Sequence, residues 1–256
     1  RPMFRAAVTL LLLAAPAGAA DPPVDFERHV VGLLGGAGCS AGSCHGSFQG
    51  KGGLRLSLFA SDPAADHLQL TRGGGGRRIN LAAPEHSLLL LKATGQVPHA
   101  GGRRFATDSL QARALRTWIA DGAKHVPGTG AVTRVEVRPA EHVLAVGGSA
   151  QAAVWATFAD GTAADVTPFC DLRAKDDSVA DVSALGAVRA LRTGDTALVA
   201  GYRGLTAVGR VLVPGQREGP YPSVPEVNFI DREVFAKLRR LNIVPSELSS
   251  DEEFLR

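Results

Sequence analysis

The chain has 256 residues, of which 28 are Lys or Arg and 25 are Asp or Glu, so its formal net charge is +3. Residues 1–20 carry two of the cations and no acid, which leaves 26 cations against 25 acids in the rest. This balance, with aromatic residues at 5 % and none interleaved with the basic clusters, excludes a nucleic-acid-binding surface of the usual kind. The length allows about two domains.

The first twenty residues have the pattern of a secretory signal peptide. Arg1 and Arg5 form a positive start, residues 6–15 an apolar core, and residues 17–19 a small-residue cleavage site. The segment is too short to be a membrane anchor, and no later apolar run approaches the length of a membrane span. We therefore expect an exported protein of the periplasm or cell surface, where cysteines form disulfides or accept haem.

Residues 24–126 are predicted to be mainly helical, with glycine-rich loops. Apolar residues recur at helical spacing in three segments, which begin near Phe26, Leu88 and Leu110. The run of four glycines at 73–76 lies between two of these segments and is predicted to be a loop.

The pattern changes after a short linker at 127–130. Residues 131–214 alternate apolar and polar side chains, with turn signals about every eight to twelve residues, which predicts a β-sandwich. Asp160-Gly161 suits a tight hairpin turn, and Asp160 and Asp165 are interpreted as turn residues rather than calcium ligands. We expect the helical region and the β region to fold independently.

A proline-rich linker at 215–225 leads into a last helical segment at 226–256. Apolar residues between Asn228 and Leu241 have the spacing of an amphipathic helix. A second helical pattern runs to the last residue without a cap, and Met3 does not stand first. We therefore expect the chain to be a fragment in which this third, helical domain is truncated.

The candidate functional site is the stretch CSAGSCHG, from Cys39 to Gly46. In c-type haem proteins two cysteines bind the porphyrin, and the histidine after the second cysteine binds the iron. The usual spacer has two residues, whereas this one has four, all of them small, which allows the loop to bulge. Two alternatives stay open: a disulfide between Cys39 and Cys44 with His45 on the surface, or a structural zinc site.

A second iron ligand has to be a histidine, because residues 21–256 contain no methionine. His99 is the best placed, 54 residues after His45 on an irregular loop before the last predicted helix of the region. The two imidazoles should then lie within about 15 Å across a loop-lined cavity. The zinc alternative would use the same four side chains, Cys39, Cys44, His45 and His99.

Four residues are expected to give the haem site apolar walls: Leu89, Leu91, Val97 and Trp118. Cys170, in the β region, is predicted to be a buried free thiol.

Residues 38–105, which contain the Cys-His motif, resemble the N-terminal cytochrome-c-like region of large exported proteins of planctomycetes. The β region, with GDTALVA at 194–200, is similar to bacterial Ig-like domains of group 2. Residues 228–256 resemble the start of the domain of unknown function 1549. This order of three parts covers nearly all of the mature chain. The resemblance implies a haem c cofactor and an axial role for His99, although the four-residue spacer departs from the standard motif.

Two functions follow from these observations. In the first, the protein is an exported haem c protein that exchanges electrons with a redox partner, Cys39 and Cys44 anchor the haem, and His45 and His99 bind the iron. In the second, it is a non-enzymatic surface module with a Cys39–Cys44 disulfide, whose Ig-like domain serves as a spacer or adheres to a cell-surface partner. The sequence contains no recognisable hydrolase or transferase site, and whether the protein is an enzyme stays open.

Overall fold

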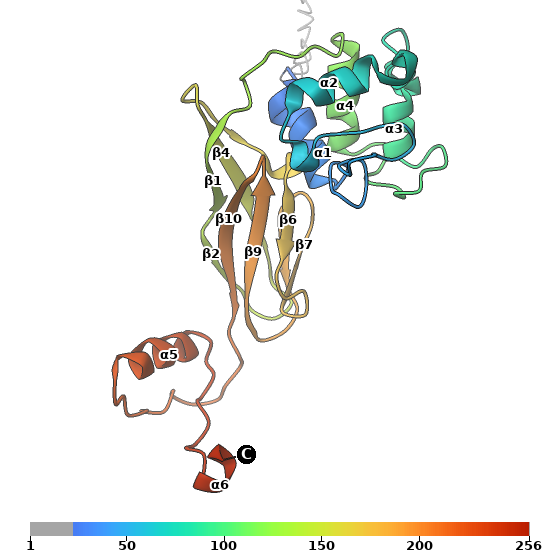
Figure 1. Cartoon of the computed structure of the whole chain (residues 1–256). Helices are drawn as coiled ribbons and strands as arrows, with labels where there is room; N and C mark the ends of the chain where they lie inside the picture. The colour runs from blue at the N-terminus through green and yellow to red at the C-terminus, as the bar shows by residue number, and fades with distance from the viewer. Residues whose placement is uncertain (1–22, 256) are drawn as a thin grey trace, which may run out of the picture.

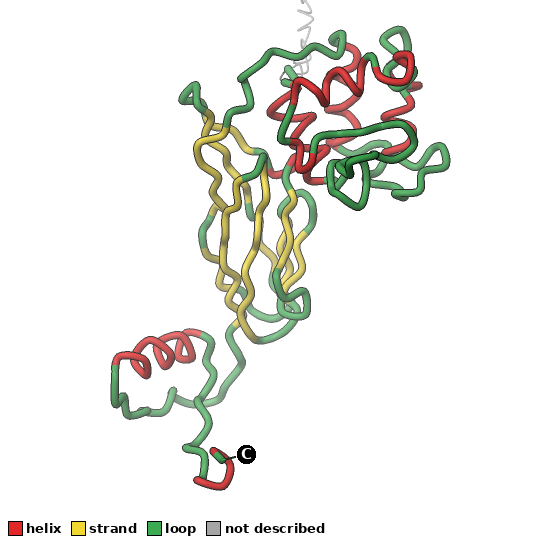
Figure 2. Tube along the Cα trace, viewed as in Figure 1, coloured by secondary structure: helices red, strands yellow, loops and turns green. Residues whose placement is uncertain are grey.

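The computed structural model describes residues 23–255, so the predicted signal peptide lies outside the described residues. The chain contains both helices and sheets, as predicted: a helical unit, a β unit and a C-terminal helical segment follow one another (Figure 1). Figure 2 shows that the helices and long loops of the first unit gather beside one end of the strands. Across residues 23–255, no helix is long and apolar enough to cross a membrane.

The helical unit consists of short helices joined by long loops. Its elements are η1 (Phe26–Val30, a π-helical turn), α1 (Val31–Gly36), η2 (Leu58–Ala60), α2 (Pro63–Thr71), η3 (Gly73–Gly76), η4 (Pro84–His86), α3 (Leu88–Ala93) and α4 (Leu110–Ala120). The helices predicted near Phe26, Leu88 and Leu110 are present. Helix α2 was not predicted; it begins after Asp62, whose side chain accepts a hydrogen bond from the Ala65 amide at 3.0 Å.

The core of the helical unit is packed around Trp118 on α4. This side chain is 1 % exposed, and its ring centroid lies 5.2 Å from that of Phe26. The indole N–H donates to the Lys124 carbonyl at 2.8 Å, so its one polar atom is satisfied. Leu70, Leu115 and Ile119 complete the buried cluster. These contacts, between η1, α2 and α4, fix the scaffold from which the loops of the unit project.

The β unit has ten strands in three small sheets that enclose one apolar core. The strands are β1 (Val132–Arg138), β2 (Glu141–Val143), β3 (Ser149–Gln151), β4 (Ala153–Phe158), β5 (Ala163–Asp165), β6 (Asp171–Ala174), β7 (Ala180–Val182), β8 (Ala187–Ala190), β9 (Gly194–Tyr202) and β10 (Leu205–Val213), with a 3₁₀ turn, η5 (Thr167–Phe169), before β6. The sheet orders are β1-β4-β5, β2-β10-β9-β6 and β3-β8-β7. All pairs are antiparallel except β2 with β10.

The predicted Asp160-Gly161 turn joins β4 to β5, where Ala156 pairs with Ala164. Gly161 has φ +83°, a conformation that glycine adopts without strain. The Asp160 carboxylate accepts hydrogen bonds from the Thr162 amide at 3.0 Å and the Thr162 hydroxyl at 2.6 Å. The interpretation of Asp160 as a turn residue is therefore confirmed.

Helix α1 packs directly against the β unit through two glycines. A Cβ on Gly32 would lie 2.7 Å from the Tyr202 ring, and a Cβ on Gly36 would lie 2.6 Å from the Cys170 carbonyl oxygen. The Tyr202 hydroxyl also donates to the Arg28 carbonyl at 2.6 Å. Leu33 belongs to the same core cluster as the strands. The two units therefore share buried packing; whether each folds independently, as expected from the sequence, stays a prediction.

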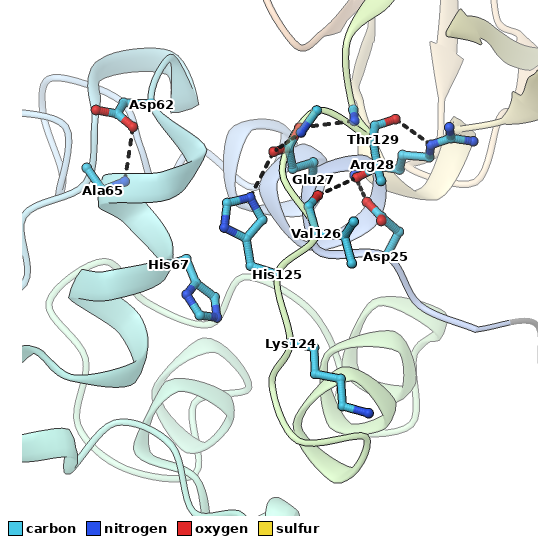
Figure 3. A network of polar contacts seen from close by, with 12 residues as sticks. Asp25, Glu27, Arg28, Asp62, Ala65, His67, Lys124, His125, Val126 and Thr129 are labelled. Carbon is cyan, nitrogen blue, oxygen red and sulfur yellow. Dashed lines mark hydrogen bonds and ion pairs between the residues drawn. The ribbon is translucent and has the colours of Figure 1, made fainter. Parts of the chain in front are cut away.

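A buried carboxylate, Glu27, holds the linker between the units. It accepts hydrogen bonds from His125 Nε2 at 2.8 Å and from the amides of Gly128 and Gly130, each at 3.0 Å. Arg203, in the β9–β10 turn, lies 3.7 Å from the same carboxylate. Figure 3 shows His125 beside the Glu27 carboxylate, to which the hydrogen bonds of this network run. The linker is therefore fixed to both units rather than open.

The C-terminal segment contains the predicted amphipathic helix as α5 (Phe229–Arg240), followed by α6 (Asp251–Phe254). Asn228 and Asp231 form a capping box at the start of α5. Charged contacts join this segment to the strands: Lys237 Nζ lies 2.7 Å from the Asp195 carboxylate. The apolar side of α5 is exposed, with Phe229 at 67 %.

Candidate functional site

The CSAGSCHG loop follows α1 directly and folds back on it. The Cys39 amide donates to the Leu34 carbonyl at 2.8 Å, and the His45 amide donates to the Cys39 carbonyl at 2.9 Å. The second bond closes the loop, so the four-residue spacer forms a compact bulge. A Cβ on Gly46 would lie 1.9 Å from the Ser40 carbonyl oxygen, which means that only glycine fits there.

The imidazole of His45 is oriented by two backbone carbonyls. Its Nδ1 lies 3.1 Å from the Lys51 oxygen and 3.2 Å from the Leu54 oxygen. A nitrogen shared by two acceptors must carry the proton, and this leaves Nε2 with the free lone pair. Burial lowers the pKa of His45, the two carbonyl bonds raise it, and the charges of His99 and Arg78 lower it further, with a net value below the usual 6.5. The ring is therefore neutral at neutral pH and able to bind a metal.

His99 lines the same cavity and is oriented in a similar way, by one backbone carbonyl. Its Nδ1 lies 2.9 Å from the Gly102 carbonyl oxygen, so Nε2 again is the free nitrogen. The two rings are nearly parallel, at 5°, and their centroids are 6.2 Å apart. The structure thus brings together His45 and His99, which the sequence separates by 54 residues, well inside the 15 Å limit expected above.

The two histidines line one cavity of about 290 Å³ together with Cys39 and Cys44. Ligand pockets in proteins have volumes of roughly 300 to 1,000 Å³, so this space lies just below that range. Its apolar wall consists of Leu34, Leu54, Leu56, Leu88, Leu89 and Ala93. Of the four wall residues predicted from the sequence, Leu89 is correct. Leu91, Val97 and Trp118 are not in the lining, and Trp118 belongs to the helical core instead.

All three cysteines are free thiols in the structure, so the Cys39–Cys44 disulfide is not formed. Burial raises the pKa of Cys39 to about 11, against a lowering by the charge of Arg104. Cys170 is buried, its Sγ lies 3.3 Å from the Thr167 carbonyl, and burial raises its pKa to about 12. The prediction of a buried free thiol at Cys170 is confirmed.

The zinc alternative requires a cluster that the structure does not assemble. Within residues 23–255, no group of three or more His, Cys, Asp or Glu side chains is arranged to hold a metal ion. The other histidines, His29, His67, His86, His125 and His142, do not line the cavity. His67 and His125 instead pack on Phe26 in the helical core.

Sequence reasoning missed the basic wall of the cavity, which is formed by Lys51, Arg77, Arg78 and Lys92. The signal that could have identified Arg77 and Arg78 is the run of four glycines directly before them, because a glycine run admits a bulky side chain close to the backbone.

Comparisons with known proteins add little to this geometry. Neither the protein-family models nor the curated proteins match the chain. Among solved structures, the chain is similar to domains 4 and 5 of the S-layer protein SbsC, with 17 % identity and a TM-score of 0.28. The match covers 32 % of this chain and about half, 51 %, of that structure.

Proposed function

We propose that the protein binds haem c at the CSAGSCHG loop and acts in electron transfer. The observation that carries the proposal is the pair His45 and His99, held parallel across an apolar cavity whose wall also contains Cys39 and Cys44. These are the side chains that a covalently attached, bis-histidine haem requires.

The orientation of the two rings supports the assignment. Both imidazoles keep a free Nε2, so His45 and His99 are the side chains that would hold the iron. Their ring centroids are 6.2 Å apart, and the rings are 5° from parallel. The Nδ1 bonds to backbone carbonyls fix both tautomers and raise the basicity of Nε2, which is the usual arrangement behind a metal-bound histidine.

The cysteines and leucines have separate tasks in this proposal. Cys39 and Cys44 would anchor the porphyrin, and the bulged spacer between them sets the separation of their sulfurs. The leucine wall excludes water and lowers the local dielectric, which raises the reduction potential of a charged centre. Bound haem would supply one-electron transfer, and two histidine ligands would leave no iron position open for catalysis.

We infer that the helical unit is cytochrome-c-like and that the β unit is an Ig-like spacer that carries it in an exported protein. The packed glycine face of α1 and the Glu27 network support a rigid connection between the two. A spacer of fixed geometry would present the cavity to a redox partner in one orientation.

The test is the mass and spectrum of full-length protein produced with haem-maturation factors. We expect a mass gain of about 616 Da, which survives acid–acetone extraction because thioether bonds persist where axial bonds do not. The doubly substituted variant Cys39→Ser/Cys44→Ser should lose this gain. Colourless protein, two hydrogens lighter than the reduced chain and with Cys39 bonded to Cys44, would instead favour the surface module.

A matched pair of histidine variants tests the ligand assignment. His99→Ala should keep the covalent mass but change the absorption spectrum, because one axial ligand is lost. His86→Ala is the control, since His86 is exposed and lies outside the cavity lining. Identical spectra for the two variants would remove His99 from the iron.

A further inference from the structure

The cavity wall contains a buried arginine that lacks an acidic partner. Arg78 is 5 % exposed, and among residues 23–255 no carboxylate lies within ion-pair distance of it. Burial, and then the charge of Arg77, lower the pKa of Arg78. Buried charges in proteins are usually paired, because removal of an ion from water without a counter-charge is costly.

The guanidinium of Arg78 has donors to spare. Its Nη1 donates to the Gln69 carbonyl at 2.7 Å, and its Nη2 donates to the Gly53 carbonyl. A guanidinium has five N–H donors in a planar fork, so these two bonds leave three. A planar fork with free donors on a cavity wall is suited to a carboxylate.

The run of four glycines at 73–76 packs against this guanidinium. A Cβ on Gly73 would lie 2.6 Å from Arg78 Nη1, and a Cβ on Gly74 would lie 3.3 Å from Nη2. Gly74 also has φ +61°, which favours glycine. The run GGGGRR therefore has a specific role: it lets the backbone close around a cation that faces the cavity.

The charge of the lining points to the ligand class. Four cations, Lys51, Arg77, Arg78 and Lys92, line the cavity, and no Asp or Glu does. Lys92 donates to the Pro98 carbonyl at 2.8 Å, but none of the four has an ion pair within the described part of the chain. Such a wall attracts an anion and repels a cation.

We infer that Arg78 and Arg77 bind the two propionate carboxylates of the haem, and that the basic wall is the subsite for the acidic edge of the porphyrin. This inference rests on the proposed function, since it names the part of that cofactor which the wall would recognise. If Arg78 only joined the Gly53 and Gln69 carbonyls, its replacement would not change the ionisation of the haem propionates.

The experiment measures the midpoint potential of the full-length haem protein between pH 5 and 8. It compares the wild type with Arg77→Gln, Arg78→Gln and a control, Arg72→Gln, which removes an exposed cation outside the lining. In the wild type, pairing with an arginine keeps the pKa of each propionate below the usual carboxyl value of about 4.3. Both propionates are then ionised between pH 5 and 8, and the midpoint potential is independent of pH. Arg77 is exposed, so its replacement keeps the fold even if that of Arg78 does not.

We expect a new titration in Arg77→Gln and in Arg78→Gln. An unpaired carboxyl at a buried cofactor has a raised pKa, and the potential then falls with rising pH as the extra negative charge stabilises the oxidised iron. Profiles of both variants that are as flat as that of Arg72→Gln would overturn the inference while leaving haem binding intact. Failure of every protein, wild type included, to acquire haem would overturn the proposed function and this inference with it.

Discussion

Replacement of Glu27 by alanine removes the acceptor on which the junction of the two units depends. Three hydrogen bonds end on this carboxylate, from His125 and from the amides of Gly128 and Gly130, and Arg203 lies 3.7 Å away. The side chain is 7 % exposed. Alanine would therefore leave the amides of Gly128 and Gly130 and the nearly buried guanidinium of Arg203 without this partner.

The expected loss of stability follows from this geometry. Removal of one member of a buried, hydrogen-bonded charge pair typically costs about 3 to 5 kcal/mol. The amides of the linker can bind water if the linker moves away from the helical unit. We therefore expect Glu27→Ala to lower the free energy of unfolding by about 3 kcal/mol, the lower end of that range. Glu27→Gln keeps the size and one acceptor, and should cost about 1 to 3 kcal/mol.

Urea denaturation followed by fluorescence can assign the loss to the helical unit. The chain has two tryptophans, Trp118 in the helical core and Trp155 on β4, so a Trp155→Phe background reports on the helical unit alone. The control is Glu136→Gln, a partly exposed acid that pairs with the exposed Arg134 and Arg138, whose replacement should change the midpoint little. Glu27→Ala with the same midpoint as Glu136→Gln would refute the role of Glu27.

The contribution of Glu27 should also depend on pH. Burial alone raises its pKa, but the hydrogen bonds from His125, Gly128 and Gly130 and the charge of Arg203 outweigh burial, and the pKa lies below the usual 4.5. A lowered pKa stabilises the folded state fully above 4.5, and this stabilisation is lost as the pH falls through the folded-state value. The difference in stability between wild type and Glu27→Gln should therefore narrow below pH 4.5; a difference that grows there would contradict the assignment.

Two further predictions concern the loop and the linkers. Gly46→Ala should abolish haem attachment, measured by intact mass, because its Cβ would lie 1.9 Å from the Ser40 carbonyl oxygen. The control Gly42→Ala, whose Cβ would have its closest contact at 3.7 Å, should attach haem normally. Equal attachment in both variants would contradict the reasoning. Limited proteolysis should cut first at 215–223, where the chain is extended and mostly exposed, and only later at 127–130, where Glu27 holds the backbone. First cleavage at 127–130 would show that the linker is open.

The sequence predicts the parts of this fold whose signals are local. Period-two alternation identifies the long strands β9 and β10, and Asp160-Gly161 identifies a turn because the aspartate bonds its own neighbours. Helix α2 escapes such reasoning. Its buried residues include Asp66, 1 % exposed, whose carboxylate accepts from the Ser57 amide at 2.6 Å. A buried acid breaks the apolar pattern on which helix prediction relies.

The candidate site also has residues that the sequence predicts and residues that it does not. The Cys-His adjacency names three residues, and the lack of methionine narrows the fourth to a histidine. The glycine run points to a close approach of Arg77 or Arg78 to the backbone, but it does not identify the partners of Arg78 at Gly53 and Gln69, which lie 25 and 9 residues away. Helical periodicity predicts that Trp118 is buried, but it does not tell whether the ring faces a cavity or a neighbouring helix. Long-range packing decides both cases.

The glycine face of α1 bears on whether the helical unit can serve as a transferable cassette. Gly32 and Gly36 are shaped to fit the Tyr202 ring and the Cys170 backbone, and the helix that carries them runs into the cysteine loop three residues later. If the helical unit were cut off at the linker, the glycine face of α1 and Leu33 would be exposed to water. Grafting the loop onto another scaffold would require a host whose surface reproduces the contour of η5 and β9. Recombination between such proteins should therefore exchange the helical and β units together, with the chain crossing over after Val213 rather than between them.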